Sequence, residues 1–186
     1  MNPSPTFTTN QPQVAVLDDI QALETLIDQS VRHLGGQKYS VRQIESSLTY
    51  IFGVDTQLIE DETYYVVKVD GQLAGAGGWS RRKTLYGGNQ AKAGLEDNLL
   101  DPAHDPAKIR AFYVAPHFAR RGIGRSLMHT CEQAARQANF QRMELMATRP
   151  GQPLYAACGF QAIEPFDIVM PDGVTLPCMK MIKPLV

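Results

Sequence analysis

The residues best suited to chemistry stand together in one segment, Arg120-Arg121-Gly122-Ile123-Gly124-Arg125. A predicted apolar strand, Ile109–Val114, precedes it, and a predicted helix over about 122–138 follows at once. The first turn of a helix leaves about four backbone N–H groups unpaired and carries partial positive charge, so its amides can cradle an anion. The two glycines remove Cβ atoms that would keep a phosphate away, and the three arginines add cations at the rim. We expect a diphosphate to bind here.

Two common nucleotide motifs are excluded by the same residues. A Walker A loop needs Gly-Lys-Ser/Thr after the second glycine, and Gly124 is followed by Arg125. The dinucleotide-binding fingerprint needs a third glycine, and Leu127 stands at that position. A Gly-x-Gly turn also occurs where a helix packs closely on a strand, so a purely structural role for the two glycines stays open at this point.

The elements that must position this segment are a mixture of α and β, with a strand–turn–helix–strand unit in the middle. Residue periodicity predicts a strand at 14–16, helices over 20–34 and 40–51, a hairpin of strands 64–69 and 72–79, strand 109–114, helix 122–138, strand 142–148, a short helix 153–158, and strands 163–170 and 176–182.

Turn and capping residues support these boundaries. Asp18 or Asp19 can cap the first helix and Ser40 the second, while Asp70-Gly71 is a strong hairpin signal. Pro171-Asp172-Gly173 marks the last turn.

Glycines and loops add two more expectations. Gly75, Gly77 and Gly78 in the second hairpin strand indicate a bulge or a close approach by another group. Residues 83–107 lack periodicity, which is typical of a functional or mobile loop.

Length and composition limit the class of protein. The 186 residues suit one domain, over 13–186, after a polar, flexible lead-in at 1–12. A formal net charge of -1 gives no overall reason to expect nucleic acid or an anionic membrane as partner. Three cysteines without paired spacing indicate buried free thiols, not disulfides or a metal site. The N-terminus lacks the pattern of a secretory signal, and no apolar run reaches the roughly 18 to 20 residues of a membrane span. We interpret the chain as a cytoplasmic monomer or homodimer.

The run from Ile109 to Met128 resembles motif A of the GCN5-related N-acetyltransferases (GNAT): a strand, then Gln/Arg-x-x-Gly-x-Gly/Ala, then a helix. Gly122 and Gly124 match the two motif glycines. Ala119 stands where the family has Gln or Arg, so that side-chain contact is absent or replaced by Arg120.

A second segment, Pro153–Phe160, resembles the family's motif B helix, Leu/Phe-Tyr-x-x-x-Gly-Phe, with Tyr155 on the family tyrosine. The resemblance covers about residues 14–183. It implies an α/β GNAT fold, with a mixed, mostly antiparallel sheet of about six to seven strands and helices on both faces.

The resemblance also implies a reaction, the direct attack of an amine on the thioester of acetyl-CoA. The cofactor would lie on the 120–125 segment and on the strand end Phe112, Tyr113 and Val114, where backbone N–H groups, that of Val114 above all, would stabilise the developing oxyanion. Tyr155 is the candidate general acid for the leaving thiolate, because a phenol is protonated at neutral pH and about as acidic as an alkyl thiol. Packing on Phe160 is the alternative role for this ring.

The remaining roles are open. Glu144 is a candidate general base if it faces the site, and a solvated strand residue otherwise; a water chain is an equal alternative. Trp79, Arg81 and Arg82 could bind a carboxylate or phosphate on the acceptor, or simply be solvated at a strand end. The expected function is acetyl transfer to a primary amine of a small molecule. The alternatives are protein or peptide N-acetylation and a non-catalytic acyl-CoA-binding module.

Overall fold

The computed structural model describes residues 11–92 and 97–185, so all but Gln11-Pro12 of the predicted flexible lead-in lies outside the described residues. Seven strands form one sheet in the order β1-β2-β3-β4-β5-β7-β6, and all neighbouring pairs are antiparallel except β4 with β5. The strands are β1 Gln13–Val14, β2 Tyr64–Val69, β3 Gln72–Ser80, β4 Ala107–Val114, β5 Arg142–Thr148, β6 Gln161–Val169 and β7 Thr175–Pro184.

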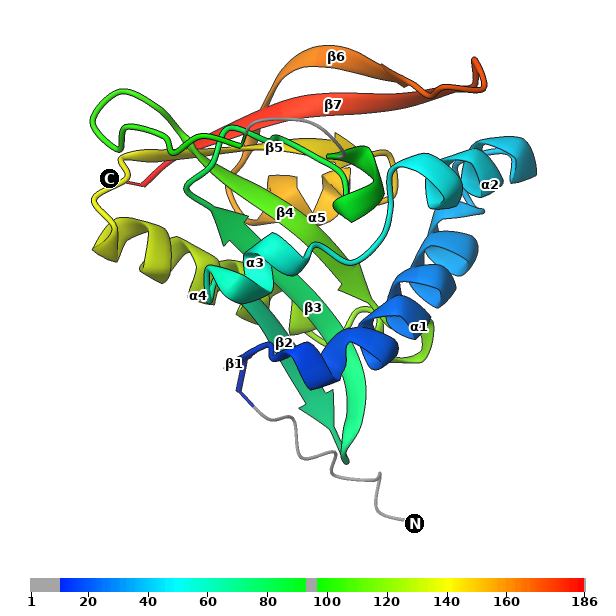
Figure 1. Cartoon of the computed structure of the whole chain (residues 1–186), viewed down its shortest axis with the longest axis horizontal. Helices are drawn as coiled ribbons and strands as arrows, with labels where there is room; N and C mark the ends of the chain where they lie inside the picture. The colour runs from blue at the N-terminus through cyan, green and yellow to red at the C-terminus, as the bar shows by residue number, and fades with distance from the viewer. Residues whose placement is uncertain (1–10, 93–96, 186) are drawn as a thin grey trace.

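Helices cover both faces of the sheet, α1, α2 and α3 on the viewer's side of Figure 1 and α4 and α5 behind it. The helices are η1 Leu17–Asp19, α1 Ile20–Ser30, η2 Val31–Gly35, α2 Val41–Tyr50, α3 Thr56–Glu60, η3 Asn89–Ala91, η4 Pro116–Phe118, α4 Ile123–Gln137 and α5 Gln152–Ala157. The predicted GNAT-type arrangement of a mixed sheet between helices is confirmed.

The sequence predicted most elements correctly, but it missed the short helices η1, η3 and η4, and three further elements differ. The first helix is α-helical only to Ser30 and continues as one π-helical segment, η2. The predicted strand 14–16 is the shorter β1, since the Asp19 carboxylate accepts a hydrogen bond from Val16 N–H (3.0 Å) and turns the chain into η1. Helix α3 was not predicted, because five residues are too few to show a helical period. The predicted cap of α2 is confirmed: Gln43 N–H donates to Ser40 Oγ (3.2 Å).

The core beneath α4 anchors the central strands. Inward-facing residues of β3, β4 and β5 pack there against Met128, Cys131 and Ala135 of α4, and these strand residues are Trp79, Ile109, Met143, Leu145 and Ala147. All are buried. Since side chains alternate along a strand, the residues between them point to the opposite face, under α1, α2 and α3.

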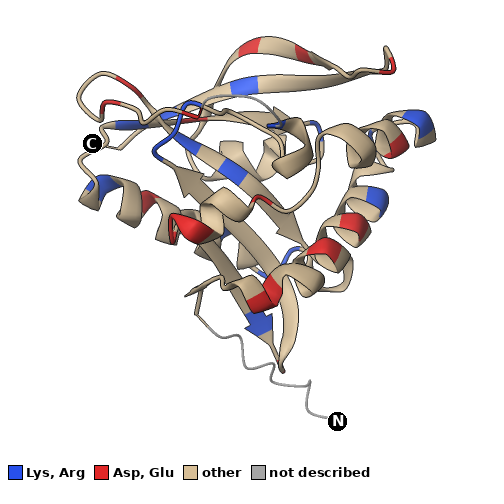
Figure 2. Cartoon of the chain, in the orientation of Figure 1, with Lys and Arg blue, Asp and Glu red and all other residues tan. Residues whose placement is uncertain are grey.

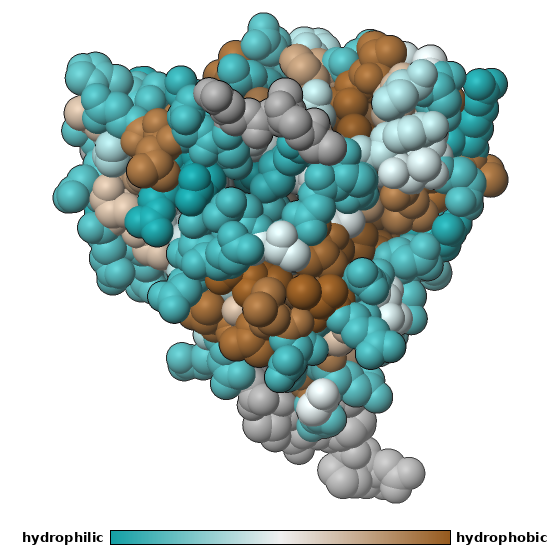
Figure 3. Space-filling view, viewed as in Figure 1, coloured by the Kyte–Doolittle hydropathy of each residue, from teal (hydrophilic) through white to brown (hydrophobic). Residues whose placement is uncertain are grey.

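Acidic and basic positions are interspersed over the helices in Figure 2, in keeping with the net charge of -1. Apolar surface in Figure 3 lies over β1 and the start of α1, where Val14, Val16 and Leu17 are exposed. Within the described ranges, no helix is long and apolar enough to cross a bilayer.

Candidate active site

The central feature of the site is the divergence of β4 from β5. The two strands pair only where they begin, Ala107 with Met143 and Lys108 with Glu144. Beyond these pairs the two strands are not paired with each other, over Ile109–Val114 of β4 and Leu145–Thr148 of β5. The sheet therefore divides into two arms. We call this unpaired stretch the β4–β5 gap. One arm is β1 to β4, and the other is β5, β7 and β6.

A backbone donor of β4 points into this gap. Ala115 N–H donates to Ala74 C=O (2.9 Å), which places the N–H of Ala115 on the β3 side. Successive N–H groups of a strand point to opposite edges, so the N–H of Val114 points toward β5. Tyr113 pairs with Ala76 of β3, and its N–H points toward β3. Among the three predicted strand-end residues, Val114 and Phe112 therefore offer amides to the gap and Tyr113 does not.

A bulge in β4 aims the side chains next to the gap. The register with β3 slips between Ala76 and Gly78, and Ala111 has a positive φ of 54°. Beyond the bulge, the Phe112 ring lies so close to β3 that a Cβ on Gly77 would meet it at 2.7 Å. The prediction that the β3 glycines mark a bulge and a close approach is confirmed.

The predicted anion cradle follows β4. Arg120 and Gly122 both adopt left-handed conformations (φ 66° and 84°), which turns successive amides of the segment to one side. The first bond of α4 runs from Ser126 N–H to Gly122 C=O (3.0 Å), so the amides of Ile123, Gly124 and Arg125 have no partner within the helix. The side chains of Arg120, Arg121 and Arg125 are exposed around this turn.

The two motif glycines have different roles. Gly122 needs its left-handed φ, and open space surrounds its Cβ direction. Gly124 is buried, and a Cβ there would lie 2.8 Å from Leu154 of α5. The expectation that both glycines keep Cβ atoms away from a phosphate is corrected for Gly124, which allows α4 and α5 to pack closely.

That packing places Tyr155, the neighbour of Leu154, beside the gap. Its ring lies edge-on to Phe112 and to Phe160, with centroids 6.2 Å apart in each pair. The phenol is protonated at neutral pH, and burial raises the pKa of Tyr155 above its ordinary value, which makes it a weaker acid than the predicted match to an alkyl thiol assumes. Tyr155 therefore has a protonated hydroxyl and also packs on Phe160, so the two alternative roles predicted for this ring are compatible.

Comparison with known proteins agrees with this geometry. Residues 25–160 match the family described as Acetyltransferase (GNAT) family. The chain belongs to this family. This makes the protein an acyl-CoA-dependent N-acetyltransferase with acetyl-CoA as its cofactor. No curated protein matches the chain by sequence.

Three solved structures share the fold of this acetyltransferase. The GCN5-related N-acetyltransferase (aminotransferase, class-II) from Rhodopseudomonas palustris has a TM-score of 0.68 and 17% identity, over 97% of this chain and 96% of that one. PaiA N-acetyltransferase from Thermoplasma acidophilum, in complex with coenzyme A, has a TM-score of 0.62 and 13% sequence identity, over 95% of this chain and 99% of that one. YncA from Salmonella typhimurium, a putative acetyltransferase with its cofactor acetyl-CoA, has a TM-score of 0.62 and 16% sequence identity, over 98% of this chain and 95% of that one.

Glu144 lies in an ion-pair cluster of the acetyltransferase, away from Val114. It pairs with Lys108 and, at 3.6 Å, with Lys180 of β7. Glu144 is level with Lys108, and Val114 follows six positions later along the bulged strand, so up to about 20 Å of strand separates the backbone positions of Glu144 and Val114. The structure does not bring Glu144 to the predicted oxyanion site.

The predicted acceptor residues are also dispersed. Trp79 is a core residue, 4% exposed, with its ring edge-on to Phe140 under α4. Arg82 makes a two-point contact with Asp61 (2.6 and 2.8 Å), which holds the pKa of that carboxyl below its usual range. Arg81 is exposed. Trp79 and Arg82 therefore stabilise the fold at the end of β3, and we correct their assignment as acceptor-binding residues.

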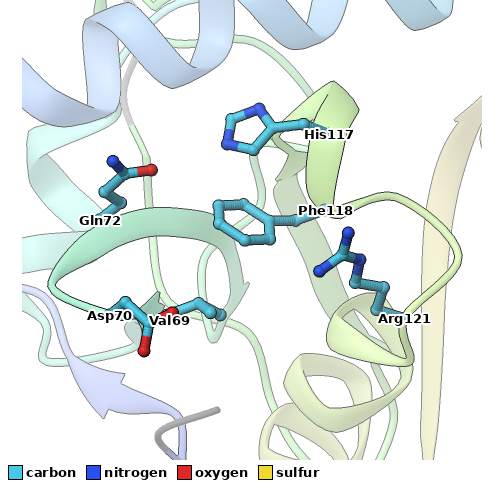
Figure 4. Close-up of a pocket in the computed structure, with 6 residues that line it drawn as sticks. All are labelled: Val69, Asp70, Gln72, His117, Phe118 and Arg121. Atoms are coloured by element: carbon cyan, nitrogen blue, oxygen red, sulfur yellow. The ribbon is translucent and has the colours of Figure 1, made fainter. Parts of the chain in front are cut away.

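A cavity of about 330 Å³ lies on the β3 side of the turn, between the β2–β3 hairpin and η4 (Figure 4). Its lining residues are Val69, Asp70, Gln72, His117, Phe118 and Arg121. The Arg121 guanidinium stacks 5.5 Å from the Phe118 ring centroid. Because β3 pairs with the opposite edge of β4, this cavity is separate from the β4–β5 gap.

Sequence reasoning missed a buried ion-pair cluster on the face under α3. Asp55, fully buried, pairs with Arg110 of β4 (2.9 Å) and with Lys92 (2.5 Å). Arg110 also donates to Gly87 C=O. The available signal was a single arginine inside the apolar run Ile109–Val114, since a buried cation requires an anionic partner.

Proposed function

We propose that this acetyltransferase moves the acetyl group of acetyl-CoA to a primary amine of a small-molecule acceptor, by direct attack. The observation that carries the proposal is the grouping of three features at the β4–β5 gap. These are the amide cradle before α4, the Val114 N–H that points toward β5, and the protonated Tyr155 ring against Phe112.

The cradle fits a diphosphate. Amides of Gly122, Ile123, Gly124 and Arg125 would hold the pyrophosphate of the cofactor, with the exposed side chains of Arg120 and Arg125 around it, whereas Arg121 stacks on Phe118. When bound, acetyl-CoA supplies a thioester whose carbonyl carbon accepts the amine.

The chain itself provides two groups for the reaction. The Val114 N–H donates to the carbonyl oxygen as that oxygen gains negative charge, and the fixed position of the strand means that little reorganisation is needed. As the C–N bond forms and the C–S bond breaks, the Tyr155 hydroxyl gives its proton to the leaving sulfur.

The amine proton needs another acceptor. The two carboxylates that are buried under α3 and beside β7, Asp55 and Glu144, are both held in ion pairs. We therefore assign the removal of this proton to water and not to Glu144.

The test is the release of CoA thiol from acetyl-CoA in the presence of a panel of amines. Tyr155→Phe is expected to lower kcat by about 10² to 10⁴, with the acetyl-CoA KM changed little, because only proton transfer is lost. Tyr65→Phe on β2, away from the gap, is the matched control and should keep full activity. Equal rates for the two variants would remove Tyr155 from the mechanism.

Two other functions remain distinguishable. A non-catalytic module would be thermally stabilised by acetyl-CoA but release no thiol with any amine. A protein N-acetyltransferase would acetylate peptides faster than small amines.

A further inference from the structure

One segment of the long loop crosses the β4–β5 gap on the face under α3. We call Tyr86–Lys92 the strap. On one arm of the sheet, its Gly87 C=O accepts a hydrogen bond from Arg110 of β4. On the other arm, the Tyr86 ring lies 6.1 Å, centroid to centroid, from Phe166 of β6. Since β4 and β6 belong to different arms, the strap spans the gap opposite the face covered by α4 and α5.

The strap is held firmly at its β4 end. Asp55 stands at the first turn of α3 yet makes no cap there, and its carboxylate instead pairs with Arg110 and with Lys92 of the strap. Burial lowers the pKa of Arg110, while Asp55 opposes this and keeps the guanidinium charged. The two ion pairs and the hydrogen bond from Arg110 to Gly87 C=O therefore connect β4, the start of α3 and both ends of the segment 87–92.

The connection between α2 and α3 holds the middle of the strap. Gly88 N–H donates to Ile51 C=O (2.8 Å), and Asn89 N–H donates to Val54 C=O (3.0 Å). The Asn89 side chain accepts from Thr56 N–H (3.0 Å), so a strap residue caps α3 in place of Asp55.

The contact with β6 is of a different kind. It is a tilted ring contact (59° between planes), and the Phe166 ring is 37% exposed. Strand β6 lies at the sheet edge, and Figure 3 shows apolar surface over the β6–β7 ribbon at the top of the view. The described part of the strap thus has a rigid β4 end and an apolar, half-open β6 end.

We propose that Tyr86 and Phe166 bind the apolar part of the acceptor, an amine that carries an aromatic or alkyl group, and that Asp55, Arg110 and Lys92 are positioning residues that hold Tyr86 for this contact. This inference rests on the proposed function. We place the acceptor at the strap because the strap lies on the side of the gap that the helix α4 does not cover. An aromatic pair recognises ring edges and alkyl groups without a charged partner.

The experiment compares 3-phenylpropylamine with propylamine, whose amino groups ionise alike. For the unmodified protein, kcat/KM is expected to be at least tenfold higher for the ring-bearing amine. Phe166→Ala and Tyr86→Ala should reduce this ratio to below about threefold and leave the acetyl-CoA KM unchanged. Exposed Ile163→Ala on the same strand is the matched control and should keep the ratio.

The positioning role is tested with Lys92→Met, which removes the most exposed member of the ion-pair cluster. It should raise the KM for 3-phenylpropylamine at least threefold with kcat within twofold. Lys68→Met on β2, which removes the ion pair of Lys68 with Asp19 of η1, should change neither value. A change in kcat alone, or equal effects of the two variants, would overturn the positioning role.

Saturation-transfer NMR with CoA-saturated protein separates failure of this inference from failure of the proposed function. Transfer to the phenyl protons of 3-phenylpropylamine, lost in Phe166→Ala, is expected and does not require turnover. Transfer without thiol release would support the aromatic site and contradict acetylation of such amines. Turnover of amines with no ring preference and no transfer would overturn the aromatic site and leave the acetyltransferase activity intact.

Discussion

Gly77 provides a direct link between packing and catalysis, and Gly77→Ala tests it. A Cβ at this position would lie 2.7, 2.8 and 2.9 Å from three atoms of the Phe112 ring. Carbon atoms in contact prefer about 3.5 to 4.0 Å, so the ring must retreat by roughly 1 Å. Overpacking of this kind costs about 1 to 3 kcal/mol, and replacing a strand glycine returns about 0.5 to 1 kcal/mol. The expected net loss in the free energy of unfolding is about 1 kcal/mol, and below about 2.5 kcal/mol.

The effect on catalysis should be larger than the effect on stability. The Phe112 ring lies edge-on to Tyr155, so its retreat should displace the hydroxyl that we propose as the proton donor to the thiolate. A displacement of about 1 Å at a reacting group can lower a rate by about 10²-fold, and we expect kcat to fall by about 10- to 100-fold with the acetyl-CoA KM nearly unchanged.

The assays are urea unfolding and steady-state thiol release. Gly173→Ala in the β6–β7 turn is the control, since its φ is 80° and nothing lies within 4 Å of the added Cβ. It should lose about 1 kcal/mol of stability by backbone strain alone and keep its kcat. If Gly77→Ala keeps its kcat as well, Phe112 does not position Tyr155.

Two further predictions concern ion pairs. Arg82 lowers the pKa of Asp61, so this pair stabilises the fold above the ordinary carboxyl pKa of about 3.9 and loses its effect as the pH falls through the lower folded value. In urea unfolding, Asp61→Asn should cost about 1 kcal/mol at pH 7 and progressively less as the pH is lowered below about 3.9, and a cost that does not change with pH would contradict the assignment. Asp55→Asn leaves buried Arg110 and half-buried Lys92 without their anion and should cost about 3 to 5 kcal/mol, part of it recovered by adding Arg110→Met. A cost below about 1 kcal/mol would contradict the assigned ion pairs.

Local patterns were sufficient to predict most of the sheet and the conformation of the turn before α4. Alternation and turn residues identified β2, β3, β5 and the Asp70-Gly71 hairpin, because these features depend on neighbours in the sequence. The turn before α4 was equally readable, since a left-handed Gly122 and an uncapped helix start are local properties.

Long-range contacts account for what was missed. Trp79 and Arg82 stand close together in the sequence, but the first faces the α4 core and the second meets Asp61, more than twenty positions earlier. The strap has no period of its own, because its order comes from Arg110, Ile51 and Val54 in other elements. The divergence of β4 from β5, on which the site depends, is a property of strand pairing that no single segment reveals.

The most direct test of the account is an amide NMR titration that compares acetyl-CoA with CoA. Both ligands should shift the amide signals of Gly122, Ile123, Gly124 and Arg125, since both carry the diphosphate. Only acetyl-CoA should shift the Val114 amide strongly downfield, because only the acetyl group offers a carbonyl oxygen to that N–H in the β4–β5 gap. A Val114 signal that does not move, or that responds equally to CoA, would contradict the proposed placement of the acetyl group.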